Sequence, residues 1–206
     1  DLQEHENVVV LPLDVTDQTS IDLAVSNIIE KEGKIDIVVN NAGYGIAGVL
    51  ETVEVEEMEK IFQVNVYGVV RVLHAVLPHM RKAKNGHVIN ISSTSGVRGL
   101  PGMEFYSGSK FALEGIMDSM RYSLAAFNIV VSNVNAGAVK TKFTERFGKG
   151  GDAAGLGSRV IDDPTGYLKF ITQNAVDSLN QRMATPEAVD PDVVGMIVVN
   201  LAKIAM

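Results

Sequence analysis

Residues 35–48, IDIVVNNAGYGIAG, decide the fold class that this sequence predicts. The stretch opens with a short run rich in Ile and Val and ends in a turn rich in Asn and Gly. A short run that is apolar on both faces is typical of a buried strand in a parallel sheet. In such sheets ligands bind beyond the carboxyl ends of the strands, where this turn would lie. The stretch therefore predicts both a parallel sheet and the edge of a binding site.

The same pattern repeats on both sides of this stretch. Short apolar runs predict strands at residues 8–13, 35–40, 88–91 and 129–134. Helical spacing predicts helices at residues 17–32, 53–81, 104–127, 163–183 and 186–205. The glycine-rich residues 148–157 predict a loop. Strands that alternate with helices of this length indicate βαβ units. We expect a single α/β domain over residues 1–206, built on a doubly wound parallel sheet.

Composition excludes several classes of function. The 206 residues carry a net charge of −7, and no basic stripe is present, so nucleic acid is not an expected partner. The absence of cysteine excludes disulfides, thiolate nucleophiles and cysteine-ligated zinc. The four histidines show no ligand spacing, so we predict no metal site. No apolar run approaches the roughly 20 residues of a membrane-spanning helix.

Gly43, Gly45 and Gly48 match the spacing of a dinucleotide fingerprint, G-x-G-x-x-G, after a strand. The fingerprint requires its third glycine to open a helix, whereas the next helix here is expected to start at residues 52–57. It also requires an acidic residue about 20 positions further on, at the end of a strand. That region lies inside a predicted helix. The spacing therefore favours a turn over a pyrophosphate cradle.

Tyr106 and Lys110 share one face of a predicted helix, because they are four residues apart. A nearby ammonium stabilises phenolate and is expected to lower the phenol pKa from about 10 toward neutrality. Such a phenol can donate a proton to a carbonyl oxygen or accept one from an alcohol. The same spacing also fits an ordinary pair on a helix surface. The two residues alone leave both interpretations open.

Ser93 and Asn65 are further polar candidates. Ser93 follows the predicted strand at residues 88–91 and could bind a substrate carbonyl, or it could cap a turn. Asn65 lies inside an apolar helix, where a buried amide needs hydrogen-bond partners. It could satisfy the local structure or take part in a polar relay, and the sequence favours neither.

Together these motifs resemble the short-chain dehydrogenase/reductase family. Six segments follow the order and spacing of that family: LDVTD at 13–17, NNAG at 40–43, NVYG at 65–68, NISS at 90–93, YSGSK at 106–110 and NAGAVKT at 135–141. The segment from residue 99 to 115 is most similar to the branch that holds 17β-hydroxysteroid dehydrogenase type 1 and the photoreceptor-type retinol dehydrogenases. The implied fold is a Rossmann-like doubly wound parallel sheet.

The resemblance implies a role for each motif residue. Tyr106 would be the proton donor or acceptor, Lys110 would lower its pKa and hold the nicotinamide ribose, and Ser93 would orient the reacting oxygen. Asn65 would hold a water molecule in a proton relay to Lys110. The implied cofactor is NAD or NADP, and its expected contacts are Asp14, Val15, Asn41, Ala42, Gly43, Tyr106, Lys110, Gly137, Val139 and Thr141.

The sequence departs from the family pattern in two places. Ala136 stands where the family usually has proline, so the turn after the last predicted strand is expected to be less rigid. The T-G-x-x-x-G-x-G turn of the family's first βαβ unit is not found in the sequence. We therefore expect a fragment whose sheet is incomplete between residues 8–13 and 35–40, without the usual final strand, and which binds NAD(P) poorly.

The implied activity is hydride transfer between NAD(P) and an alcohol or carbonyl on an apolar substrate such as a steroid, retinoid or acyl chain. Residues 141–185 would form a substrate lid. The helices at 53–81 and 104–127 would form the interface of a homodimer or homotetramer. The cellular location is open, with the cytoplasm favoured. The alternative is a catalytically silent fragment or a non-enzymatic binding protein of the same fold.

Overall fold

A computed structural model describes residues 7–141, 143, 163–184 and 190–204 of the chain. Three parallel strands form its sheet in the order β1 (Ile37–Asn40), β2 (Gly86–Ser93) and β3 (Ile129–Ala136). Each strand coincides with one of the predicted apolar runs. The parallel α/β architecture predicted from those runs is therefore confirmed.

The central strand β2 (GHVINISS) is the most buried of the three, and its buried residues include the polar His87, Asn90, Ser92 and Ser93. Seven of its eight residues are buried, and a strand lies on either side of it. The flanking strands are less buried, with one buried residue of four in β1 and three buried residues of eight in β3. Val39 and Val130 are examples, with roughly two fifths of each residue exposed (42% and 45%).

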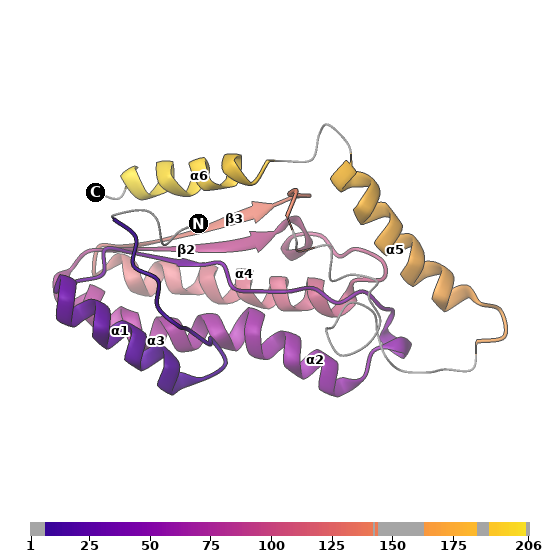
Figure 1. The fold of residues 1–206 in the computed structure, drawn as a ribbon, viewed down its shortest axis with the longest axis horizontal. Helices are drawn as coiled ribbons and strands as arrows, with labels where there is room; N and C mark the ends of the chain where they lie inside the picture. Colours follow the sequence, from indigo (N-terminus) through magenta and orange to yellow (C-terminus); the bar gives the residue numbers. More distant parts are fainter. Residues whose placement is uncertain (1–6, 142, 144–162, 185–189, 205–206) are drawn as a thin grey trace.

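Helices α1 (Gln18–Glu32), α3 (Val69–Ala83) and α4 (Glu104–Ala125) lie together on one face of the sheet (Figure 1). Helix α6 (Pro191–Ile204) lies on the opposite face and contacts β3 (Figure 1). Helix α5 (Tyr167–Ala184) stands apart, beyond the end toward which the strand arrows point (Figure 1). All five correspond to helices that the spacing predicts.

The helix ends carry the expected signals. The Asp17 side chain accepts a hydrogen bond from the Thr19 backbone N–H and caps the start of α1. Gly33 ends that helix with φ +76°, a left-handed conformation that glycine adopts without strain. Helix α2 (Val55–Phe62) begins with a capping box formed by Glu54 and Glu57. The predicted helix start at residues 52–57 is therefore confirmed, and Gly48 does not open a helix.

The main hydrophobic core lies between the sheet and the layer of α1, α3 and α4. Its buried members are Ile21, Val25, Val69, Val72, Leu73, Val76, Leu77, Met80, Val88, Leu113, Met117, Leu124, Ile129 and Val131. A second cluster, near the ends of the strands, contains Ile46, Ala47, Val53, Ile61, Met103 and Tyr106. Both clusters include residues of α4, with Tyr106 in the second and Leu113, Met117 and Leu124 in the first, so α4 is packed along its length.

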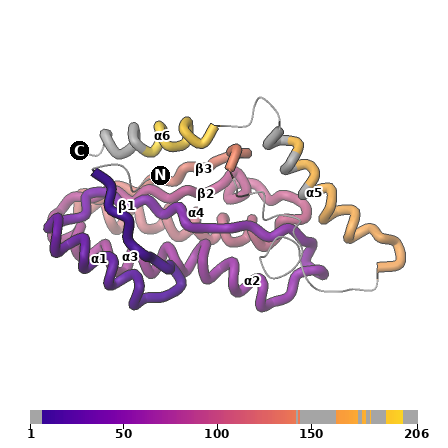
Figure 2. Tube along the Cα trace, in the orientation of Figure 1, coloured from indigo at the N-terminus to yellow at the C-terminus, as the bar shows by residue number. Residues whose placement is uncertain are grey.

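Helices α2 and α3 form one continuous helical stretch from Val55 to Ala83, which Figure 2 follows as a single path. The junction is a π-helical segment, η3 (Gln63–Gly68), in which Asn65 and Gly68 are buried. This stretch is long and apolar enough to cross a membrane, but half of its most apolar part is buried in the protein. That burial identifies it as a core helix.

The strand predicted at residues 8–13 is wrong. The segment is irregular and exposed, with Val9 at 69% and Leu13 at 52%. An isolated strand gains little without a neighbour to accept its backbone hydrogen bonds, and β1 pairs only with β2 among the described residues. The glycine-rich loop predicted at 148–157 lies outside the described residues.

Candidate active site

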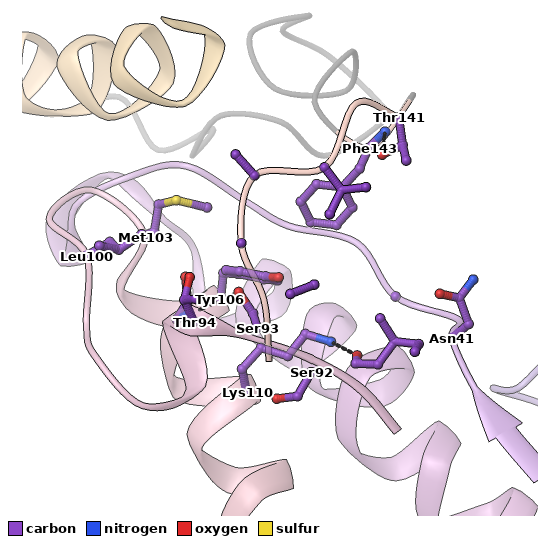
Figure 3. Close-up of a pocket in the computed structure, with 17 residues that line it drawn as sticks. Asn41, Ser92, Ser93, Thr94, Leu100, Met103, Tyr106, Lys110, Thr141 and Phe143 are labelled. Atoms are coloured by element: carbon purple, nitrogen blue, oxygen red, sulfur yellow. Dashed lines mark hydrogen bonds between the residues drawn. The ribbon is translucent and has the colours of Figure 1, made fainter. Parts of the chain in front are cut away.

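A pocket opens at the carboxyl ends of the three strands (Figure 3). Parallel strands deliver all their following loops to this edge, as the sequence predicts. The residues that line it are Asn41, Gly43, Ile91, Ser92, Ser93, Thr94, Ser95, Leu100, Met103, Tyr106, Lys110, Ala136, Gly137, Ala138, Val139, Thr141 and Phe143. Segments that are far apart in the sequence thus build one site.

Tyr106 lies in the first turn of α4 and is 6% exposed. Burial raises the pKa of its phenol, and a side-chain hydrogen bond with Ser93 lowers it, with burial the larger effect. The net direction is opposite to the one predicted from the Tyr106–Lys110 spacing. The phenol is therefore protonated near neutral pH and can act as a proton donor.

Lys110 lies one turn further along α4, and its ammonium reaches under the pocket (Figure 3). Its Nζ donates a hydrogen bond of 2.9 Å to the backbone oxygen of Ile91 and lies 5.9 Å from the centre of the Tyr106 ring. Burial lowers the pKa of Lys110 to about 8, and the Glu114 carboxylate opposes that shift.

Ser93 ends β2 and caps the short 3-10 turn η4 (Thr94–Gly96), its Oγ accepting a hydrogen bond of 3.0 Å from the Ser95 backbone N–H. The capping interpretation is therefore confirmed, and it does not conflict with a second contact. The Ser93 hydroxyl also meets Tyr106, so both hydroxyls face the same part of the pocket. The neighbouring Ser92 hydroxyl is buried and has no hydrogen-bond partner among the described residues.

Asn65 fastens the turn after β1 to the π-helical segment. Its Oδ1 accepts from the Tyr44 N–H at 3.1 Å, and its Nδ2 donates to the Tyr44 oxygen at 2.9 Å and to Ser109 Oγ at 3.0 Å. The structural interpretation of Asn65 is thus confirmed, because both amide hydrogens are used within the protein. Asn65 Oδ1 also lies next to the pocket floor at Gly43, so the relay interpretation stays a prediction.

Gly43 leaves a narrow space between these side chains. A Cβ atom at this position would lie 3.1 Å from Asn65 Oδ1 and 3.8 Å from Lys110 Nζ. Any larger residue would fill the floor of the pocket beside the ammonium. The glycine therefore keeps that floor open to a ligand.

The cofactor contacts implied by the family resemblance fall into two groups. Asn41, Gly43, Gly137, Val139 and Thr141 line the pocket together with Tyr106 and Lys110, and Ala42 lies in the same turn. The structure thus brings together eight of the ten residues. Their roles toward a cofactor stay predictions.

Asp14 and Val15 lie outside the pocket. The Asp14 carboxylate accepts hydrogen bonds from the Thr16 N–H and hydroxyl, which lower its pKa. Val15 packs against η3, where a Cβ at Gly68 would meet its side chain at 2.9 Å. Val15 therefore has a packing role, and contact of either residue with an adenine stays a prediction.

The described part of the site fits the nicotinamide and ribose end of a dinucleotide. The Lys110 ammonium has three N–H donors, of which the Ile91 oxygen takes one, so donors are left to face the space above Gly43. A ribose carries vicinal hydroxyls that accept such bonds. No described loop matches a pyrophosphate cradle, since only a short 3-10 turn, η2 (Leu50–Thr52), follows the Gly43–Gly48 turn, and the first α-helix after it starts at Val55.

Two further predictions concern metals and the lid. The described residues contain no group of three or more His, Asp or Glu that could hold a metal ion.

Most of the first half of the predicted lid at residues 141–185 lies outside the described residues. Its described part includes Phe143, whose ring packs against the Tyr106 ring with centres 5.7 Å apart.

Comparison with known proteins agrees with this geometry. The family model described as short chain dehydrogenase matches residues 1–151. A 3-ketodihydrosphingosine reductase of Bacteroides thetaiotaomicron is 45% identical over 66% of this chain and 51% of its own length. Estradiol 17-beta-dehydrogenase 1 of Rattus norvegicus is 37% identical over 89% of this chain and 50% of its own. The chain spans about half the length of these curated relatives.

Solved structures of the same family share the fold. A metagenomic short-chain oxidoreductase in complex with NADP is 33% identical, with a TM-score of 0.58 over 63% of this chain and 59% of its own. The segment at 99–115 resembles the branch of the family that holds 17β-hydroxysteroid dehydrogenase type 1 and the retinol dehydrogenases. The similarity to the rat estradiol 17-beta-dehydrogenase supports that branch.

Proposed function

The chain belongs to the short-chain dehydrogenase family, and we propose that the protein is an NAD(P)-dependent oxidoreductase that interconverts an alcohol and a carbonyl. One observation carries the proposal: Ser93, Tyr106 and Lys110 come from two different elements and share one pocket wall. Each fits the role that the family motif implies. The 33% identical oxidoreductase forms a complex with NADP, which supports this class of cofactor.

The proposed chemistry divides between the cofactor and the protein. A bound nicotinamide cofactor supplies or accepts the hydride at the substrate carbon. Tyr106 donates its phenolic proton to the carbonyl oxygen during reduction, or accepts the hydroxyl proton during oxidation. Ser93 donates a hydrogen bond to the same oxygen and fixes its position. Burial keeps Tyr106 protonated, which suits the reductive direction.

Lys110 has a supporting role in this proposal. Its ammonium is held at the Ile91 oxygen and faces the pocket floor, where it would bind the ribose hydroxyls. The positive charge would also stabilise the Tyr106 phenolate that remains after proton transfer. Asn65 would act by holding the turn at Gly43–Tyr44 in place.

The substrate proposed for this pocket is apolar. Its outer wall is built from Leu100, Met103, Val139 and Phe143, and Met103 is 4% exposed. Such a wall has few groups to pair with a polar substrate and favours burial of hydrocarbon. The names of the two curated relatives specify a sphingoid ketone and a steroid, which agrees with this wall.

A substrate panel tests this function. The protein is mixed with NADH or NADPH and with a steroid ketone, a sphingoid ketone or retinal, and with NAD or NADP and the matching alcohols. We expect the cofactor absorbance to change with at least one apolar substrate and not with a sugar ketone of similar reactivity. A folded protein that oxidises or reduces no member of the panel would refute the proposal.

We also propose that the protein forms a homo-oligomer through η3 and α4. Each presents an exposed aromatic residue, Tyr67 at 48% and Phe111 at 46% exposure, and buried aromatic residues are a common feature of interfaces. The mass in solution, measured by light scattering, should exceed that of one chain. Phe111→Glu should shift it toward the monomer, and a monomeric wild-type protein would contradict the proposal.

A further inference from the structure

A ladder of asparagine amides crosses the sheet beneath the pocket. Asn40, Asn90 and Asn133 are register partners on β1, β2 and β3. Asn40 Nδ2 donates to Asn90 Oδ1 at 2.8 Å, and Asn90 Nδ2 donates to Asn133 Oδ1 at 3.0 Å. Every amide therefore points its N–H in the same direction, from β1 toward β3.

The ladder ends on the carboxylate of Glu114 in α4. Asn133 Nδ2 donates to Glu114 Oε2 at 2.6 Å, and Asn135 Nδ2 donates to Glu114 Oε1 at 2.6 Å. Hydrogen bonds to an ionised acceptor are stronger than neutral ones, and aligned amides polarise one another. Glu114 is thus the charged terminus that orders the direction of the whole ladder.

The ladder connects every segment that supplies a polar group to the pocket. Asn40 directly precedes the turn that contains Asn41 and Gly43, and Asn135 also donates to the backbone oxygen of Ser93 at 3.3 Å. Glu114 lies one helical turn after Lys110 on α4. The position of α4 along the sheet, and so of Tyr106 relative to Ser93, is therefore tied to one carboxylate.

We propose that Glu114 is a positioning residue of the active site, whose carboxylate anchors the amide ladder and fixes α4 against the strand ends. The effect of Glu114 on catalysis rests on the proposed oxidoreductase function, whereas its effect on the structure does not. Glu114 does not line the pocket and acts through the residues that do. The sequence carries its signal in one asparagine in each of the three apolar runs that form strands, at positions 40, 90 and 133.

Electrostatics gives Glu114 a second effect on the site. Burial lowers the pKa of Lys110, and the nearby Glu114 carboxylate raises it. The other groups that face Lys110 Nζ are the Tyr106 ring on α4, the Ile91 oxygen on β2, and Gly43 and Asn65 beside the pocket floor. Of these groups only Tyr106 titrates, and its phenol stays protonated around the pH at which Lys110 loses its charge, because burial raises the pKa of Tyr106. Removal of the Glu114 charge should therefore favour neutral Lys110.

The first test is a direct titration of Lys110 in the whole protein. The ¹³C signal of its Cε, assigned by its loss in Lys110→Arg, is followed with pH in wild type and in Glu114→Gln. We expect a lower midpoint in Glu114→Gln. Asp118→Asn is the matched control, since Asp118 is an exposed carboxylate one turn further along α4, and its midpoint should equal that of wild type. An unchanged midpoint in Glu114→Gln would overturn the electrostatic part of the inference whether or not the protein is an oxidoreductase.

The second test measures positioning by steady-state kinetics on a substrate found with the panel. Asn135→Ala keeps the Glu114 charge but removes one of its two hydrogen bonds, so it should lower kcat by about tenfold while leaving the Lys110 midpoint in place. Glu114→Gln should lower kcat by at least as much and move the alkaline limb of its pH profile to lower pH. Wild-type kcat in both variants would overturn the positioning role.

An inactive wild-type protein would refute the proposed function instead, and hydrogen exchange then tests the positioning role without a substrate. The backbone amides of β3 and α4 should exchange faster in Asn135→Ala than in Asp118→Asn. Equal exchange rates in the two variants would overturn the positioning role.

Discussion

The two walls of the pocket are held in place by different forces. The wall formed by β2 and α4 is fixed by hydrogen bonds, including those of Lys110 to the Ile91 oxygen and of Ser93 to the Ser95 N–H. The wall formed after β3 meets it mainly through apolar contact, as where the Phe143 ring packs on Tyr106. Hydrogen bonds specify distance and direction, whereas apolar packing tolerates changes of shape. The difference suggests that the first wall sets the reaction and the second selects the substrate.

The largest effect is expected on the hydrogen-bonded wall, from Tyr106→Phe. Removal of the phenolic hydroxyl deletes the proton donor, so kcat should fall by about 100- to 10,000-fold while the affinity for the cofactor stays close to that of wild type. Stopped-flow kinetics and cofactor titration measure the two quantities. Tyr122→Phe is the matched control on the same helix, since Tyr122 is 87% exposed, and it should behave as wild type. A Tyr106→Phe variant within about tenfold of wild type would remove the assigned role.

Loss of Asn65 should destabilise the floor between the walls. Asn65→Ala leaves the Tyr44 N–H and oxygen without their partners, at a cost of about 1–3 kcal/mol for each of these partly buried groups. The free energy of unfolding, from urea denaturation, should fall by about 3 kcal/mol in total. A loss below about 0.5 kcal/mol in Asn65→Ala, as at an ordinary surface site, would show that the clamp is not important for the fold.

The pH dependence reports the state of Lys110. Its pKa is lowered to about 8 by burial, so the ammonium is present below that pH and is lost above it. A rate that requires the ammonium should therefore be constant below pH 8 and fall by up to about tenfold per pH unit above it. Measuring kcat at intervals of about one pH unit between pH 6 and 10 tests this expectation. A limb that appears only near the ordinary lysine pKa of 10.5 would contradict the assignment.

The smallest effect is expected on the apolar wall. Phe143→Ala removes packing against Tyr106 and opens the outer pocket, so KM for the apolar substrate should rise by about tenfold with little change in kcat. A shorter analogue with the same carbonyl serves as the control, because it does not reach the wall and its KM should stay constant. An equal loss for both substrates would mean that Phe143 supports the chemistry, and the contrast between the walls would fail.

The sequence predicts the three strands because each contains a short run rich in Ile and Val, which is typical of strands in a parallel sheet. It also predicts which residues meet at the strand ends, since Ser93, Tyr106 and Lys110 belong to motifs with defined spacing. The error at residues 8–13 has a physical cause. Apolar residues favour a strand, but the strand forms only where a neighbour offers backbone partners, and no described strand pairs with this segment.

Two features of the site depend on contacts that spacing does not specify. The direction of the Tyr106 pKa depends on how deeply α4 is buried, which outweighs the charge four residues away. The amide ladder depends on register between strands more than 40 residues apart in sequence. One asparagine in each of the three runs that form strands is its visible signal, and only the alignment of the strands turns three separate residues into one network.

A double-mutant cycle between Ser93→Ala and Tyr106→Phe tests most directly whether the two hydroxyls act on the same atom. The value of kcat/KM is measured for wild type, both single variants and the double variant on one substrate. Groups that hold a single oxygen in the transition state act as a unit, so the double variant should lose little more than Tyr106→Phe alone. Losses that multiply, within about twofold, would show that the two residues act independently and would contradict the account.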